Sequence, residues 1–354
     1  MRNAPPRSVC LLRLSALGDV THVLPVVHAL RTAWPEVALT WVIGKPEHRL
    51  LAELPGVEFI VVDKASGWRG YQRLRRQLGG RRFDALLVMQ LALRANVLST
   101  ALHADVRVGY DRARAKELHG LFVNRRIPPM TDPHLHVREV LAAFVVPLGL
   151  PVAAPTWDFP ISAEARTWAA QQLPGEQPTL IVSPCSSHSA RNWLPERYAA
   201  VGDHAAERGW RVVLCGGRST MERQMADTIV LAMRHRPLDL TGKDSLPQLP
   251  ALLERADLVL SPDSGPVHIA NAVGTRVLGL YACTDPRRSG PCSDLRWTVD
   301  RYDAAARKFL GKPATDLAWG TKIEQPGAMA LIEATAVIEA FERCAAAQDG
   351  GTTR

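Results

Sequence analysis

The sequence predicts an α/β protein of two halves, each a parallel sheet covered by helices. Three observations predict this class. Short apolar runs rich in Val, Ile and Leu alternate with amphipathic stretches along the chain, which is typical of parallel sheets with helices on both faces. The length of 354 residues favours two domains, because one domain usually holds about 100 to 200 residues. A segment with three prolines separates the two patterns.

The first half, residues 1–150, alternates five expected strands with helices. The apolar runs that we expect to form strands are Val9–Leu14, Ala38–Ile43, Phe59–Val62, Ala85–Met89 and Val106–Val108. Helices are expected near residues 20–33, 45–53, 68–79, 92–102 and 134–148. The proline-containing segment Leu148–Ser162 follows, and we interpret it as the interdomain linker.

The second half, residues 151–327, repeats the alternation. Its expected strands are Thr179–Ser183, Arg211–Cys215, Leu258–Ser261 and Arg276–Tyr281. Helices are expected near residues 162–173, 195–208, 219–233, 246–255 and 265–273. A less regular region, 301–326, precedes a third part, 328–354, which we expect to be one long helix over 328–346 with a frayed tail.

Composition excludes several classes of protein. With 47% hydrophobic and 22% charged residues the chain is not mostly disordered, and no apolar run reaches the roughly 18 residues of a membrane span. Arg13 and Asp19 interrupt the apolar start, so we expect a cytoplasmic protein without a signal peptide. The six cysteines form no C-x-x-C pair, which argues against a zinc site or a disulfide framework and indicates reduced thiols.

The net charge of +8 is unevenly distributed. Residues 1–150 carry +9 and residues 151–354 carry −1, so we expect the first half to bind an acidic partner. The stretch Lys64–Arg82 holds seven basic residues and no acidic one. A run of charge is usually a solvated helical face, but here the missing counter-charges favour an anionic ligand.

The loop after the first strand, LSALGDVTH, contains a candidate catalytic carboxylate. Gly18 permits a tight turn, and Asp19 falls at the start of an expected amphipathic helix. Asp19 could simply cap that helix. Alternatively, because ligands bind at the carboxyl ends of parallel strands, it could take a proton from a substrate hydroxyl.

Two loops of the second half are candidate anion sites. Hydroxyls and a guanidinium precede a helix in SPCSSHSARNWLPERY, and a glycine opens the next such helix in SPDSGPVHIANAVGT. Helix N-termini, hydroxyls and arginine suit a phosphate, although either loop alone could be merely polar. The candidate residues are Ser186, Ser187, Ser189 and Arg191 in one loop and Asp263, Ser264, Gly265 and His268 in the other.

Several common motifs are missing from the sequence. There is no D-x-D, no His pair at metal-binding spacing near these loops, and no G-x-x-x-x-G-K-[ST] signature. A dinucleotide fingerprint does not follow the first strand, which argues against hydride transfer. We therefore expect any pyrophosphate to be neutralised by protein donors alone, without metal or cofactor.

The chain resembles the ADP-heptose:lipopolysaccharide heptosyltransferases of glycosyltransferase family 9. The motifs that carry the resemblance are LSALGDVTHVLPVVHALR, SARNWLPERY, GGRSTMERQMA and LSPDSGPVHIANAVGT with the following YACTDP. The resemblance implies a GT-B fold, with two Rossmann-like domains facing across a cleft. Residues 1–150 would bind the acceptor and 151–327 the nucleotide sugar, and the final helix would return toward the first domain.

The resemblance also implies an activity and its residues. The reaction would be an inverting, metal-independent transfer of heptose from ADP-heptose to a hydroxyl of the lipopolysaccharide inner core. Asp19 matches the family's proposed general base and Glu222 an acidic residue that contacts the nucleoside. Ser186, Ser187 and Arg191 match the phosphate-binding loop. The donor loop is matched by Asp263, Ser264, Gly265 and His268.

The charge split suggests how the acceptor is held. We expect the basic stretch to bind the acidic acceptor near the inner leaflet, with the protein peripheral at the inner face of the inner membrane. The expected acceptor-binding residues are Lys64, Arg69, Arg73, Arg75 and Arg76. Two alternatives stay open: another GT-B nucleotide-sugar enzyme, with a different donor sugar or an epimerase activity, and, less favoured because only Trp68 and Tyr71 interleave the basic stretch, a nucleic-acid-binding protein.

Overall fold

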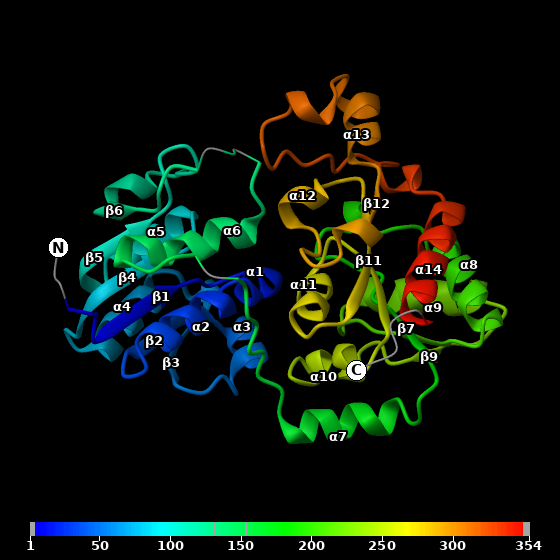
Figure 1. Cartoon of the computed structure of the whole chain (residues 1–354), viewed down its shortest axis with the longest axis horizontal. Helices are drawn as coiled ribbons and strands as arrows, with labels where there is room; N and C mark the ends of the chain where they lie inside the picture. Colours follow the sequence, from blue (N-terminus) through cyan, green and yellow to red (C-terminus); the bar gives the residue numbers. More distant parts are fainter. Residues whose placement is uncertain (1–3, 131, 133, 153, 350–354) are drawn as a thin grey trace. The chain divides into compact units, whose positions relative to one another are not determined.

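The computed structural model describes residues 4–130, 132, 134–152 and 154–349, and the tail from residue 350 lies outside them. The chain divides into two compact units, Met1–Pro160 and Ile161–Arg354 (Figure 1). The boundary falls inside the expected linker, whose described part between residues 149 and 162 forms neither helix nor strand. In the described part of the chain no helix is both long and apolar enough to cross a membrane.

Unit 1 contains, within its described residues, a six-stranded sheet in the order β3-β2-β1-β4-β5-β6, and all neighbouring strands are parallel. The strands are β1 (Ser8–Leu12), β2 (Ala38–Gly44), β3 (Val57–Val62), β4 (Arg82–Val88), β5 (His103–Gly109) and β6 (Arg125–Arg126). The central strand β1 is apolar on both faces because helices cover both, and Val9 to Leu12 are fully buried.

The helices of unit 1 connect these strands, except that the last helix follows β6, and two expected helices are divided. They are α1 (Leu17–Thr21), α2 (Leu24–Ala33), α3 (Lys45–Leu51), α4 (Gly67–Leu78), α5 (Leu93–Ser99) and α6 (Val137–Ala142). The expectation of one helix over 20–33 was wrong. Pro25 lacks an N–H and lies in the first turn of α2, so the helix is interrupted at His22 and Val23. Similarly, 134–148 becomes α6 and a 3₁₀ helix, Ala143–Leu148, that contains Pro147.

Unit 2 contains, within residues 161–349, a second six-stranded parallel sheet in the order β12-β11-β10-β7-β8-β9. Its strands are β7 (Thr179–Val182), β8 (Arg211–Leu214), β9 (Leu238–Asp239), β10 (Leu258–Pro262), β11 (Arg276–Tyr281) and β12 (Val299–Asp300). The sequence gives no apolar run for the edge strands β6, β9 and β12, because each is only two residues long.

The expected helices of unit 2 form close to their predicted positions, and two short helices over 286–289 and 302–305 were not predicted. They are α7 (Ala163–Gln172), α8 (Pro195–Glu207), α9 (Thr220–Ala232), α10 (Gln248–Glu254), α11 (Gly265–Ala272), α12 (Pro286–Ser289), α13 (Tyr302–Ala305) and α14 (Ala334–Asp349). The final helix begins later than expected, after a 3₁₀ turn at Met329–Leu331.

Helix α14 packs on the core of unit 2. Its residues Val337, Phe341 and Cys344 are buried there, and the ring of Phe341 lies 5.0 Å from that of Trp210. Its expected return toward the first domain stays a prediction. All six cysteines are free thiols, in agreement with the expectation of reduced thiols, and burial raises the pKa of Cys185 to about 12.

Both units have the same strand order when each is counted from its own first strand, 3-2-1-4-5-6. This is the order of Rossmann-type sheets, in which ligands bind where the direction of strand progression reverses. In unit 1 the reversal lies between β1 and β4, and in unit 2 between β7 and β10. The loops that follow these four strands are therefore the places to look for a site.

Candidate functional site

Asp19 lies in the first turn of α1, in the loop region that follows β1. Its contacts are compatible with both interpretations, a helix cap and a candidate base. Its carboxylate oxygen Oδ2 accepts a hydrogen bond from the backbone N–H of Ala16 at 3.0 Å, as a helix cap would. The same oxygen lies 2.6 Å from Nη2 of Arg13. These two contacts fix the orientation of the carboxylate. The side chain is 36% exposed, so it remains accessible to solvent.

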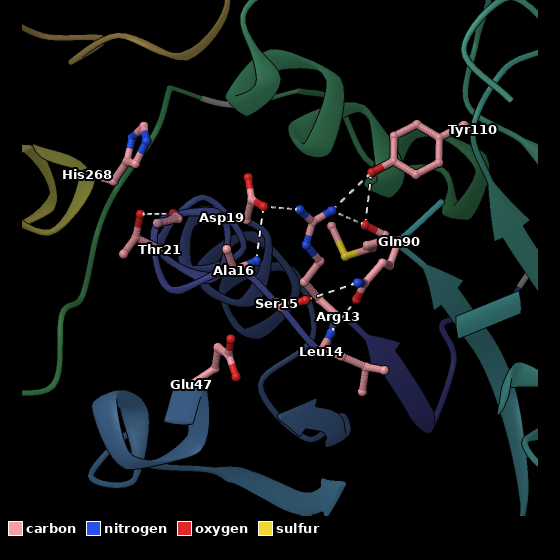
Figure 2. A network of polar contacts seen from close by, with 12 residues as sticks. Arg13, Leu14, Ser15, Ala16, Asp19, Thr21, Glu47, Gln90, Tyr110 and His268 are labelled. Atoms are coloured by element: carbon pink, nitrogen blue, oxygen red, sulfur yellow. Dashed lines mark hydrogen bonds and ion pairs between the residues drawn. The ribbon is translucent and has the colours of Figure 1, made fainter. Parts of the chain in front are cut away.

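Arg13, the partner of Asp19, is a buried guanidinium at the switch point of the first sheet (Figure 2). Its Nη1 donates to the backbone carbonyl of Met89, after β4, and lies 3.4 Å from the hydroxyl of Tyr110. Burial acts to lower the pKa of Arg13, but the charges of Asp19 and Tyr110 and the hydrogen bonds to both together outweigh it, so the pKa is raised. Arg13 therefore stays charged and connects the loops after both switch-point strands.

Gln90 holds the same two loops together from the other side. Its Oε1 accepts from the backbone N–H of Leu14 at 2.7 Å, and its Nε2 donates to the hydroxyl of Ser15 at 3.1 Å. Figure 2 shows this pair beside the Arg13–Asp19 pair. The loop that carries Asp19 is thus preorganised by Arg13, directly after β1, and by Gln90, after β4.

The predicted acceptor residues divide into two groups along unit 1. Lys64 follows β3, and its Nζ lies 2.7 Å from Oε1 of the buried Glu47. The four arginines are exposed on α4, which runs from the carboxyl end of β3 to the amino end of β4. Arg69 therefore lies near the edge of the sheet that carries Asp19, whereas Arg75 and Arg76 lie near the opposite edge.

Arg75 and Arg76 line a surface hollow of about 540 Å³ together with His103, the first residue of β5. The structure does not bring these two arginines to the loops after β1 and β4. Arg73 occupies an intermediate position on the same helix. The acceptor role of the set stays a prediction, and the geometry favours Lys64 and Arg69 within it.

Arg191, in the loop after β7, is clamped by two carboxylates in unit 2. Its Nε and Nη2 donate to Oε1 of Glu324 at 2.9 and 2.7 Å, and its Nη1 donates to Oδ2 of Asp263 at 3.2 Å. Burial acts to raise the pKa of Glu324, but the hydrogen bonds and the charge of Arg191, together with nearby basic residues, outweigh it, so the pKa is lowered. The guanidinium is thus held in one orientation, next to the loop after β10.

The serines of this loop differ in exposure. Ser186 is buried, and its N–H donates to Oδ1 of Asn192 at 2.7 Å. Its hydroxyl accepts from the N–H of His188 at 3.4 Å, whereas Ser187 is exposed. This arrangement keeps a tight turn in which an exposed hydroxyl precedes Arg191.

The loop after β10 leads directly into the N-terminus of α11. Ser264 is the N-cap residue, with extended backbone and no side-chain bond to the helix, and Gly265 is the first helical residue. The hydroxyl of Ser264 lies 2.8 Å from that of Ser261, which donates to the carbonyl of Ser183. His268, one turn along, has its Nε2 4.0 Å from Oδ1 of Asp263. The two predicted anion loops thus meet at the second switch point.

Glu222 lies in the first turn of α9, after β8. Its Oε1 accepts from the N–H of Gly217 at 2.6 Å, and its Oε2 accepts from the hydroxyl of Ser219 at 2.6 Å. Ser219 in turn accepts from the N–H of Glu222, which completes a capping box. A Cβ at Gly217 would lie 2.8 Å from the Glu222 carboxylate, so glycine permits this close approach. The nucleoside role of Glu222 stays a prediction.

Sequence reasoning missed four residues that build these loops: Arg13, Gln90, Tyr110 and Glu324. Arg13 was counted only as an interruption of an apolar run, although a charge at the end of a buried strand is itself a signal. Glu324 comes from the irregular region 301–326, where no periodic pattern aligns it with Arg191. Among the described residues no group of three or more His, Cys, Asp or Glu side chains could hold a metal ion.

Comparison with known proteins identifies the family. The family model described as glycosyltransferase family 9 (heptosyltransferase) matches residues 71–309. The chain is 40% identical over 333 residues to the lipopolysaccharide core heptosyltransferase OpsX of Haemophilus influenzae, covering 94% of this chain and 95% of that one. It is 25% identical over 293 residues to lipopolysaccharide heptosyltransferase 1 of Pseudomonas aeruginosa, covering 80% of each.

Solved structures show the same fold at lower identity. A glycosyl transferase family 9 structure from Veillonella parvula matches with a TM-score of 0.78 and 23% identity over 96% of this chain and 97% of that one. The Escherichia coli heptosyltransferase WaaC with ADP matches with a TM-score of 0.70 and 21% identity over 96% and 98%. At such identities these structures support the fold alone.

The two Rossmann-like units show the GT-B fold that the resemblance implied. The chain belongs to glycosyltransferase family 9 (heptosyltransferase). The resemblance stated from the motifs is confirmed by the family model and by the 40% identical relative. The cleft between the two domains stays a prediction.

Proposed function

We propose that the protein transfers heptose from ADP-heptose to a hydroxyl of the lipopolysaccharide inner core, with inversion and without a metal ion. The observation that carries the proposal is the meeting of Arg191, Ser264 and the N-terminus of α11 at the second switch point. The name of the 40% identical relative supports the acceptor class. A WaaC structure with ADP-2-deoxy-2-fluoro heptose supports the donor class through the shared fold.

The donor diphosphate would lie on the N-terminus of α11. The first N–H groups of a helix have no partner inside it and attract anions, and the start of α11 at Gly265 lets a phosphate approach the backbone. Arg191 supplies a positive charge from the neighbouring loop, and Ser187 an exposed hydroxyl. Glu222, after the adjacent strand β8, would accept hydrogen bonds from the nucleoside.

The chemistry then needs one base and one stabilised leaving group. Asp19 would take the proton of the acceptor hydroxyl while that oxygen bonds to the anomeric carbon from the face opposite the diphosphate. The bond between the anomeric carbon and the phosphate oxygen breaks, and ADP leaves with its electron pair. Arg191 and the α11 N–H groups would stabilise the charge that grows on the β-phosphate.

The acceptor would be held by the basic side of unit 1. Lys64 and Arg69 lie at the same edge of the sheet as Asp19, so they suit the acidic groups of an inner-core acceptor. Because that acceptor is part of a lipid, the protein would work as a peripheral protein at the inner face of the inner membrane. The excess of basic residues in the first 150 residues supports this location.

The decisive experiment is Asp19→Asn, because asparagine keeps an oxygen that can cap α1 but cannot act as a base. With ADP-heptose and a panel of truncated core lipopolysaccharides, we expect kcat to fall by about 10²–10⁴ while ADP affinity changes less than about twofold. Product linkage analysis on the wild type identifies the acceptor hydroxyl. A variant with full kcat would show that Asp19 is only a cap.

A further inference from the structure

Unit 1 displays a group of large apolar side chains on its outside that neither the core nor the proposed reaction uses. We call it the apolar surface, and it consists of Trp68, Leu93, Val97, Leu118 and Leu121. Leu121 is 79% exposed, Leu118 65% and Trp68 63%. Exposed apolar residues scattered singly are ordinary, but a contiguous group marks an interaction site.

Hydrogen bonds show that the three segments carrying this surface adjoin one another. The backbone N–H of Leu93, at the start of α5, donates to the carboxylate of Glu117, and Asn96 donates to the carbonyl of Glu117 at 3.1 Å. Trp68 stacks on Tyr71 with ring centroids 4.7 Å apart, and the hydroxyl of Tyr71 lies 3.2 Å from that of Thr100, after α5. The five exposed side chains are therefore carried by adjoining segments of unit 1: α4, α5 and the turn at 117–121.

The turn that presents Leu118 and Leu121 is built to hold them outward. Glu117 and Leu118 both have positive φ, 50° and 60°, which residues other than glycine rarely adopt. The buried His119 anchors the turn from below: its Nε2 accepts from the N–H of Tyr110, and its Nδ1 lies 2.7 Å from Oδ1 of Asn96. The leucines are thus displayed by a rigid turn whose backbone conformation is unfavourable on its own.

Basic side chains surround the apolar surface. Arg94 is exposed between Leu93 and Val97, and its Nη1 donates to the carbonyl of Lys64. Residues 112–126, which contain the turn, hold five basic residues and one acidic residue, Glu117. Arg126 lies over the turn, with Nη2 2.9 Å from the place of a Cβ on Gly120. An apolar centre with a basic rim is complementary to an anionic lipid surface.

We propose that the apolar surface docks unit 1 onto an anionic phospholipid bilayer, with Trp68, Leu118 and Leu121 inserted at headgroup depth. α4 and α5 begin at the carboxyl ends of β3 and β4, and the turn follows the carboxyl end of β5. This is the edge of the sheet from which the loop of Asp19 emerges. Docking there brings the candidate base toward an acceptor embedded in the same bilayer, and this orientation rests on the proposed function.

The test compares paired variants of the full chain in sedimentation with vesicles of phosphatidylethanolamine and phosphatidylglycerol. Leu118→Ser with Leu121→Ser should weaken vesicle binding by about tenfold or more, because both apolar side chains leave the interface. Lys116→Glu with Arg125→Glu should weaken it by a factor of about 5 per residue at low salt, and less at high salt. The matched control is Leu231→Ser, since Leu231 is 86% exposed on α9 of unit 2.

Transfer assays separate this proposal from the proposed function. With a deacylated, water-soluble acceptor the leucine variant should keep the wild-type rate, and with the same acceptor in vesicles its rate should fall. A chain that binds vesicles through these leucines but transfers no heptose to either acceptor would leave docking intact and refute the function. Docking itself is overturned if the leucine variant binds vesicles like the wild type, or if it changes only the oligomeric mass in light scattering, which would assign the surface to a protein partner.

Discussion

The two units have the same strand order and the same switch point, yet their loops carry different chemistry. In unit 1 the loop after β1 presents a carboxylate, Asp19, held by a buried arginine. In unit 2 the loops after β7 and β10 present hydroxyls, Arg191 and the start of a helix. The first 160 residues carry a net charge of +8 and the rest are neutral. The fold thus fixes where a ligand binds, and the loop residues determine which ligand.

Within unit 2 the largest expected effect is that of removing Arg191, which tests whether the two units have different roles. Arg191→Met should lower kcat/KM for the donor by about 10²–10³, because one donor to the leaving phosphate disappears. ADP affinity, measured by calorimetry, should fall in parallel, and KM for the acceptor should not change. Arg234→Met is the control, since that arginine is 71% exposed in the same unit. An unchanged ADP affinity would mean that Arg191 serves only to pair Glu324 and Asp263.

The second prediction concerns the acid stability of unit 1. Burial, with a smaller contribution from the charge of Arg126, lowers the pKa of His119 from 6.5 to about 4. The folded unit therefore gains stability above pH 6.5 that is lost as the pH falls toward 4, by roughly 3 kcal/mol in total. Urea unfolding at several pH values should show this slope in the wild type. A His119→Gln variant should lose it, and a variant that keeps the full slope would contradict the assignment.

Unit 2 should show the opposite pH dependence through Asp244. Burial, opposed by Arg218 and assisted by Glu222, raises the pKa of Asp244 from 3.8 to about 6. Stability that is present below pH 3.8 is then lost as the pH rises through 6, by about 3 kcal/mol. Asp244→Asn should be more stable than the wild type at pH 7 and equally stable at pH 4 in thermal unfolding. Equal stability at both values would contradict the prediction.

The smallest effect separates the two groups of predicted acceptor residues. Arg69→Glu should raise KM for the acceptor several-fold, whereas Arg75→Glu, at the other end of α4, should change it less than about twofold at physiological salt. Both arginines are exposed on one helix, so the variants are matched in chemistry. Steady-state kinetics at low and high salt provide the measurement. Equal effects would show that the whole helix contacts the acceptor.

Sequence periodicity predicted the long buried elements well and the local breaks poorly. The strand Arg276–Tyr281 was predicted with its observed bounds, because its buried residues form one apolar run. The helix expected over 20–33 failed at Pro25, and the two-residue strands β6, β9 and β12 carry no pattern that could reveal them. A hydrophobic pattern indicates which residues are buried. The two-residue edge strands bury too few residues to produce such a pattern.

The sequence predicted the loop residues of the candidate site but not the residues that orient them. Asp19, Arg191 and Ser264 follow buried strands, so the rule for carboxyl ends of parallel strands locates them. Arg13 and Glu324, which orient the first two, were not found, because their partners are distant in sequence or lie in an irregular region. Ion pairs depend on which residues lie close together in the folded chain. A single sequence contains no periodic signal for such pairs.

The Glu324 contact has a consequence for how a donor would enter. Glu324 directs one carboxylate oxygen, Oε1, at two nitrogens of the Arg191 guanidinium, Nε and Nη2, which a phosphate oxygen would otherwise be able to accept from. A phosphate that binds Arg191, as proposed, must therefore displace the Glu324 carboxylate or share the guanidinium with it. The segment around residue 324 would then be released when ADP occupies the site. We expect its amide hydrogen exchange to become faster when ADP binds.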